Sequence, residues 1–261
     1  MDVKTAKVLF LDGKYVDAAR MFREGAADGD AECAHNYGYC LLHGYGVERD
    51  ESLAKSFFVF ASRTVGEAAY NLAVMYLHGT GVARDYRKVV EYMNDAADLG
   101  VIEAQLYLGI AHTMGELFEP DVVCLSLIPF HKAEYRPEGN MIEGEIEVDG
   151  EDESRRASAI KQDLTEAFYR FRQAAAHPDD YVEEMALKGK YLYARCFIDG
   201  VGVDFDRDRG NALMLFAASE GSQEALYYLS TEAPYVLDRV KDKKFLEKIK
   251  KVERLGRSHE R

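Results

Sequence analysis

The sequence of 261 residues predicts an all-α protein in which short helix pairs stack into a solenoid. Three observations support this fold class. A Gly-x-Gly-Val loop recurs along the chain, an Asp follows each copy at a constant offset, and Pro is scarce at 5 residues. Self-similarity with a period of about 20–50 residues is typical of repeat architectures, and Pro breaks helix interiors.

The glycine loop predicts the junction between the first helix of each repeat (helix A) and the second (helix B). Successive copies stand 35 residues apart, counted from Gly44 to Gly79. Glycine permits positive φ after helix A, and an Asp four residues past the second Gly suits the N-cap of helix B. The copies are Leu41–Val47, Tyr76–Val82 and Phe197–Val203, and the Asp residues are Asp50, Asp85 and Asp206.

Small residues mark the rest of each repeat. Helix A carries Gly38, Ala73, Gly109 and Ala194, where backbones are expected to approach closely. Helix B carries a small pair eleven residues after its Asp: Ala61–Ser62, Ala96–Ala97 and Ala217–Ala218. A glycine then closes the segment and suits the position after a helix C-terminus: Gly66, Gly100 and Gly221.

This frame predicts one solenoid domain over residues 1–261. The expected repeats are roughly 3–30, 31–66, 67–101, 102–178 (interrupted), 184–221 and 222–232 (partial). From Ala68 to Asp85 the second repeat has 17 residues, whereas Ala104 to Asp163 spans 59, so the third repeat holds 59 − 17 = 42 extra residues. The segment 236–261 is expected to form a basic C-terminal capping helix or tail.

The insertion, residues 116–160, is the part least like the repeats. Residues 122–128 are apolar, and residues 141–148 alternate apolar with acidic, as a half-buried strand would. The two segments predict a small β-hairpin. Insertions in repeat proteins often carry the binding role, but long surface loops are also tolerated at little entropic cost, and both interpretations stay open.

These motifs resemble those of the Sel-one-like repeat family, close relatives of the tetratricopeptide repeats, over most of residues 3–232 outside the insertion. The resemblance implies a right-handed α-solenoid. It also implies an adaptor or scaffold that binds other proteins, because most members of the family act in this way. The family further suggests a bacterial origin.

In such solenoids the A helices line the inner groove, so partner-contacting residues are expected there. Acidic residues recur at the start of helix A at Glu32, Glu67, Glu103 and Glu224; they either line the groove or complement the helix dipole. In related tetratricopeptide domains, Lys and Asn grip a terminal carboxylate. Asn36 and Asn71 match the Asn positions, but Glu32 and Glu67 replace the Lys. The other candidates are His35, Tyr39, Tyr70, Tyr191 and Arg195.

Charge narrows the class of partner. The net charge of −13 disfavours nucleic acid and anionic membranes, and the groove acids favour a basic or neutral protein segment. The sequence shows no signal peptide and no apolar run of transmembrane length, and Cys33, Cys40, Cys124 and Cys196 form no metal or disulfide spacing. A reducing cytoplasm is therefore the expected location.

We expect neither catalysis nor a cofactor. The glycine loops match neither the phosphate-binding nor the dinucleotide-binding pattern, and no hydrolase motif occurs. His43 and His78 share a register but lack a recurring third metal ligand. Two alternatives stay open: an enzyme or small-molecule binder like the β-lactam-binding branch of the family, whose paired cysteines are here Ala69 and Ala97, and self-assembly through the solenoid ends.

Overall fold

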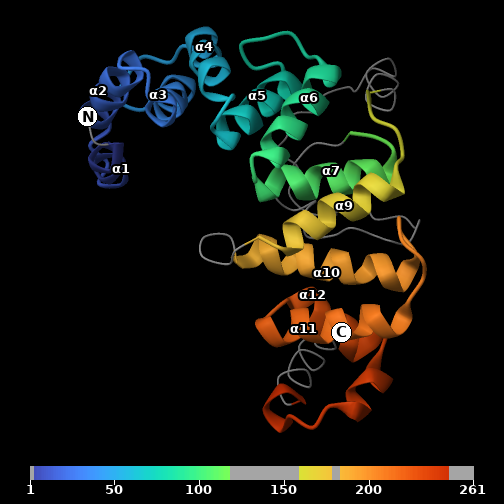
Figure 1. Cartoon of the computed structure of the whole chain (residues 1–261). Coiled ribbons are helices and arrows are strands. Elements are labelled where there is room, and N and C mark those ends of the chain that lie inside the picture. Colours follow the sequence, from blue (N-terminus) through green and yellow to red (C-terminus); the bar gives the residue numbers. More distant parts are fainter. Residues whose placement is uncertain (1–2, 118–158, 178–182, 247–261) are drawn as a thin grey trace, which may run out of the picture. The chain divides into compact units, whose positions relative to one another are not determined.

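The structure is a computed structural model that describes residues 3–117, 159–177 and 183–246 (Figure 1). Every regular element in these ranges is helical. The helices are α1 (Val3–Leu11), α2 (Tyr15–Ala27), α3 (Ala31–His43), α4 (Glu51–Ala61), α5 (Gly66–His78), α6 (Tyr86–Asp98), α7 (Ile102–Met114), α9 (Leu164–Ala175), α10 (Glu183–Asp199), α11 (Arg207–Glu220) and α12 (Gln223–Thr231), followed by the 3₁₀ helix η2 (Pro234–Arg239).

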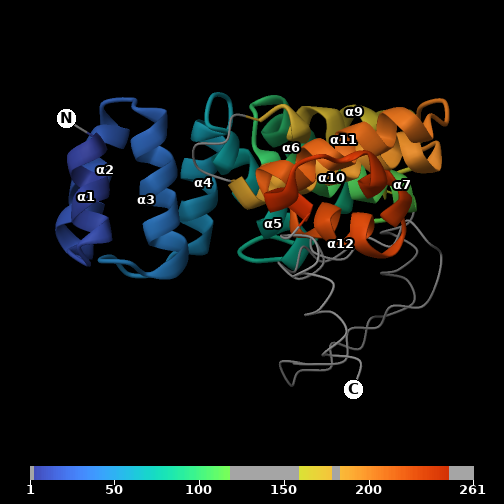
Figure 2. The same cartoon turned by 90° about the horizontal axis from the view of Figure 1, so that it is seen from below.

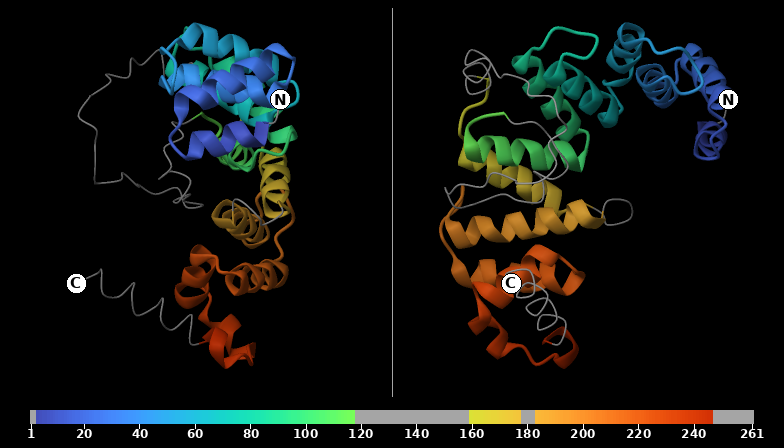
Figure 3. Two further views of the ribbon diagram at one scale, coloured as in Figure 1. Left: turned by 90° about the vertical axis from the view of Figure 1, so that its left-hand side faces the viewer. Right: turned by 180° about the vertical axis from the view of Figure 1, so that it is seen from behind.

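The helices form two compact units. Within the described residues, the first holds 3–108, 116–117 and 159–161, and the second holds 109–115 and 162–246. In the first unit α1 packs on α2, α3 on α4 and α5 on α6 (Figure 2). In the second, α10 packs on both α9 and α11 (Figure 3). The A helices are therefore α1, α3, α5, α7, α10 and α12, and helix pairs are the building block that the sequence predicts.

The predicted Asp caps are confirmed. The Asp50 Oδ1 accepts a hydrogen bond from the Leu53 amide at 2.8 Å, and Asp206 accepts one from the Arg209 amide at 3.0 Å. Asp85 and Asp163 each accept two amide bonds at the start of α6 and α9. Removing such a cap costs about 1 kcal/mol, so these four side chains fix where α4, α6, α9 and α11 begin.

The two glycines of each loop do different work. The first, such as Gly200, ends helix A in a left-handed conformation, with φ of 71°. The second, such as Gly202, also has positive φ, but it lies on the backbone that starts the preceding B helix. A Cβ at Gly202 would stand 1.8 Å from the Leu164 carbonyl oxygen. Gly46 and Gly81 make the same approach to Tyr15 and Glu51. The loop is thus the joint between consecutive repeats.

Helix A and helix B are matched in size inside each repeat. A Cβ at Gly38 would stand 2.9 Å from the Phe58 ring, and a Cβ at Gly109 would stand 2.5 Å from the ring of Phe171. In the other two full repeats, Ala replaces the Gly on helix A and Met replaces the Phe on helix B. By register these residues are Ala73 and Met93, and Ala194 and Met214, and all four are fully buried.

Gly66 differs from the prediction. Gly100 and Gly221 follow helix ends with positive φ, as expected. Gly66, however, is the first residue of α5, and Val65 is its N-cap. A Cβ there would stand 2.6 Å from the Val101 side chain, so close packing against the next helix junction, not chain reversal, requires the glycine.

The C-terminal segment also differs at its start. Residues 234–239 form the 3₁₀ helix, and Val240 is extended with φ −85° and ψ 122°. Asp242 then accepts hydrogen bonds from the amides of Lys244 and Phe245 and begins a new helical turn. The capping helix or tail predicted for 236–261 is described only as far as residue 246 and stays a prediction. Residues 247–261, residues 118–158 of the insertion and its predicted hairpin lie outside the described residues, and the single-domain boundary of 1–261 stays a prediction.

Candidate functional site

The predicted groove residues of the first unit lie on neighbouring A helices. The Asn71 amide of α5 donates to the His35 Nε2 of α3 at 3.1 Å, which ties the two helices together. Asn36, by contrast, donates to the Glu32 carbonyl of its own helix at 2.7 Å. We call the surface made by residues 32, 35, 36, 39, 67, 70, 71 and 103 the A-helix face. It includes Glu103, whose charge contributes to raising the pKa of Tyr70.

The same electrostatic relation occurs twice on this face. The Glu at the start of one A helix acts on the pKa of a ring on the preceding A helix: Glu67 acts on His35, and Glu103 acts on Tyr70. Burial lowers the pKa of His35, with Glu67 opposing, and burial and then Glu103 raise the pKa of Tyr70. The imidazole and the phenol are therefore both held neutral near pH 7.

The three acids of the A-helix face differ in whether they form an ion pair. Glu32 forms an ion pair with Lys7 of α1. Glu67 is exposed and Glu103 half-buried, and neither makes an ion pair within the residues that the structure describes. The Lys7 pair shows how a cation sits on this row of acids. The two following positions on α5 and α7 offer the same charge without a cation.

Tyr39 belongs to an aromatic cluster. Its ring centroid lies 4.4 Å from that of His43, 6.0 Å from Tyr45 and 6.3 Å from Phe10. Tyr15 stacks on Tyr45 at 5.0 Å. The cluster fixes the end of α3 against α1 and α2, and Tyr39 within it is half-buried.

In the second unit, Tyr191 and Arg195 contact each other. Arg195 is 4% exposed, donates to Asp199 at 2.7 Å and to the Tyr191 hydroxyl at 3.1 Å, and lies over the Tyr228 ring at 5.6 Å. This network stabilises the packing of α10 on α12. The contribution of Tyr191 and Arg195 to partner binding stays a prediction.

The sign of the charge changes on α10. Twelve residues before the loop glycine, α3, α5 and α7 carry Glu32, Glu67 and Glu103, whereas α10 carries Lys188, which is 6% exposed. Sequence reasoning missed this residue because it followed the acidic positions alone. The register counted from Gly200 was the available signal.

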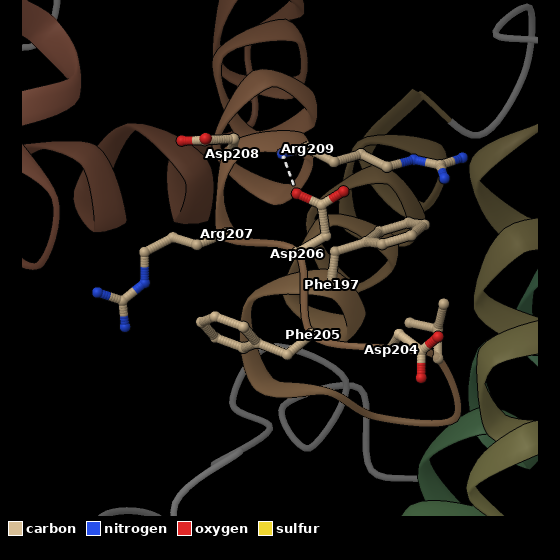
Figure 4. Close-up of a pocket in the computed structure, with 8 residues that line it drawn as sticks. Phe197, Asp204, Phe205, Asp206, Arg207, Asp208 and Arg209 are labelled. Carbon is tan, nitrogen blue, oxygen red and sulfur yellow. Dashed lines mark hydrogen bonds between the residues drawn. The ribbon is translucent and has the colours of Figure 1, made fainter.

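A second feature that the sequence did not predict is a hollow of about 540 Å³ at the start of α11 (Figure 4). Phe205 is 60% exposed there and stands where the other loops carry Arg49 and Arg84. Arg207 lies over Phe205 at 5.6 Å, and Arg209 extends over the Phe197 ring at 4.3 Å. Asp204, Asp206 and Asp208 alternate with these groups, so charges of both signs line the hollow.

The cysteines that the structure describes are buried and protonated. Burial is the largest cause that raises the pKa of Cys33 and Cys40 to about 11 and that of Cys196 to about 12, so all three remain thiols near pH 7. Among residues 3–117, 159–177 and 183–246, no three His, Cys, Asp or Glu side chains gather as metal ligands. No helix in those ranges is long and apolar enough to cross a bilayer.

Comparison with known proteins identifies the family of these repeats. The sequence model of the Sel1 repeat matches residues 31–63, 66–101, 156–179 and 187–222, which coincide with the helix pairs and the interrupted third repeat. The chain belongs to the Sel1 repeat family. The predicted fold class, an all-α solenoid of helix pairs, is thereby confirmed. Sel1 repeat proteins generally mediate protein–protein interactions and are generally non-catalytic.

A solved structure with a TM-score above 0.5 supports the fold. A Sel1 repeat protein from Oxalobacter formigenes superposes with a TM-score of 0.63 at 19% identity, over 88% of this chain and 74% of that one. A protective antigen present in uropathogenic Escherichia coli strains, with an SLR fold, gives 0.42 at 18% identity, over 97% and 56% of the two chains. A search of curated proteins finds no match to this Sel1 repeat chain.

Proposed function

We propose that this Sel1 repeat protein is an adaptor whose A-helix face binds a basic or neutral peptide or helix of a partner protein. The observation that carries the proposal is the row of acids. Lys7 neutralises Glu32, whereas Glu67 and Glu103 have no cation within the described chain and frame the half-buried Tyr70. A cationic partner would find both a charge and an aromatic anchor there.

The spacing of the acids suggests the partner's pattern. Glu67 and Glu103 stand at the same register of α5 and α7, the A helices of consecutive repeats. A segment that crosses both helices could therefore bring one Lys or Arg to Glu67 and another to Glu103. Arg or Lys could also lie over the Tyr70 ring, which adds a cation–π contribution.

Affinity capture with charge-reversed baits tests this proposal. The intact chain and a Glu67→Lys/Glu103→Lys variant are immobilised and exposed to the same lysate, and captured proteins are identified by mass spectrometry. We expect the double variant to lose partners that the intact chain retains. The matched control is Glu91→Lys/Asp95→Lys, which makes the same charge change on two exposed residues of α6.

The result that would sink the proposal is equal recovery of the same partners by the A-helix variant and the intact chain. If both double variants lose the same partners, the net charge of the protein explains the loss, and this result would also count against binding at the A-helix face. A further bait, with 118–158 replaced by a short glycine-rich loop, assigns the role of the insertion. A partner lost only from this bait binds through the insertion.

A further inference from the structure

A second hollow lies on the B-helix side of the second unit, where α9, α10 and α11 meet. Its volume is about 250 Å³. The small Ala175 and Ala176 line it together with the larger Tyr193, Leu213 and Phe216. Ligand pockets for drug-sized molecules span about 300–1,000 Å³, so this hollow suits a single large side chain instead of a cofactor.

Lys190 makes this junction different from those of the first unit. Ten residues before the loop glycine, α3 and α5 carry the fully buried Ala34 and Ala69 and α7 carries the buried Gln105, but α10 carries Lys190. The Lys190 ammonium pairs with the Glu220 carboxylate at 2.8 Å and lies 6.0 Å from the Phe216 ring centroid. A charged side chain thus crosses from α10 to α11 where α3 and α5 carry a methyl group and α7 an uncharged amide.

The rim combines exposed apolar surface with positive charge. Phe216 is 54% exposed. Arg172 is exposed at the same rim and makes no ion pair among the residues that the structure describes. Glu220 pairs with Lys190, and Arg172 is the other charged side chain that lines the hollow among the residues that the structure describes, in a chain of net charge −13. Such a positive apolar site is complementary to an acidic segment with a large apolar side chain.

We infer that this hollow docks one large apolar side chain of an acidic partner segment, with a carboxylate of that segment paired to Arg172. The apolar side chain contacts Tyr193 and Phe216 and rests on the two alanines. The carboxylate and the guanidinium form a charge-assisted, bidentate pair at the rim. The protein thereby has a second recognition surface whose charge preference is opposite to that of the A-helix face.

Fluorescence anisotropy with defined peptides tests the inference. The probe is a short fluorescein-labelled peptide with one Phe between pairs of Glu, and its companions carry Ala for the Phe, Gln for the Glu residues, or Lys for the Glu residues. We expect the full chain to bind the probe about tenfold more tightly than the Ala peptide, because burying one aromatic side chain supplies this factor. Phe216→Ala should remove most of that preference.

Charge reversal supplies the control. Arg172→Glu should lower the affinity for the probe about fivefold and raise the affinity for the Lys peptide. Arg23→Glu should change neither affinity. Arg23 occupies the same register on the B helix α2, is exposed, and carries the same charge. Both sites are on the surface, so both variants should fold, which far-UV circular dichroism verifies.

Three results would overturn the inference. They are equal binding of the Phe and Ala peptides, an equal effect of the two Arg variants, and a dimer by light scattering that Phe216→Ala dissolves, since the occupant would then be a second copy of the chain. Because Glu67→Lys/Glu103→Lys leaves Arg172 and Phe216 untouched, failure of the A-helix face and failure of this hollow are distinguishable.

Discussion

The paired glycines of one loop offer a sharp test of how the repeats are joined. Gly200 and Gly202 have nearly the same positive φ, 71° and 66°. Their surroundings differ, because a Cβ at Gly200 would meet nothing nearer than 3.8 Å, whereas a Cβ at Gly202 would stand 1.8 Å from the Leu164 carbonyl oxygen. Replacing each in turn by Ala therefore separates backbone strain from steric collision.

The expected losses follow from these distances. A non-glycine residue in the left-handed region costs about 1–2 kcal/mol, and the stiffer unfolded chain returns about 0.4–1 kcal/mol. Gly200→Ala should therefore lose about 1 kcal/mol of unfolding free energy. Gly202→Ala adds overpacking against backbone, about 1–3 kcal/mol, so we expect a total loss of about 3 kcal/mol.

Urea unfolding followed by far-UV circular dichroism measures both variants, with the free energy obtained by linear extrapolation. Gly44→Ala and Gly46→Ala repeat the comparison in the first unit, where the nearest atoms to the added Cβ lie at 3.7 and 2.2 Å. Equal losses at Gly200 and Gly202 would refute the view that the second glycine is the joint between repeats.

Three further predictions use the same measurement. Gly38→Ala should lose about 1 kcal/mol, since overpacking against Phe58 exceeds the gain in helix propensity, and adding Phe58→Met should recover part of it; additive losses would contradict the size matching. Because burial lowers the pKa of His35, stability should fall as pH drops below about 6.5, and His35→Gln should flatten that slope; an unchanged slope would place the titration elsewhere. Asp163→Ala should cost about 1 kcal/mol, and no loss would exclude its capping role.

Short sequence motifs were enough to predict most of the fold. Asp at a fixed offset and paired glycines are properties of a few neighbouring residues, so Asp163 could be placed as a cap even after the long interruption. Gly66 shows the limit of this reasoning. A glycine can serve positive φ or close packing, and only the position of Val101 decides between them.

The candidate site depended on partners that are remote in sequence. The pairing of His35 with Asn71 crosses two helices, and the burial of Arg195 follows from Asp199, Tyr191 and the next helix together. Periodicity placed these residues on helix A but could not say which were already engaged. The α9–α11 hollow could not be predicted for the same reason, since its lining comes from three helices that are separate in the sequence.

The matched sizes inside each repeat constrain how such a gene can be rearranged. A crossover inside a repeat would join helix A of one copy to helix B of another and could set Ala73 against Phe58, or Gly38 against Met93. The first product is overfilled and the second leaves a void, and both lose stability. A crossover in the segment between repeats keeps Gly with Phe and Ala with Met. Duplication or loss of whole repeats therefore changes the length of this protein with the smallest loss of stability.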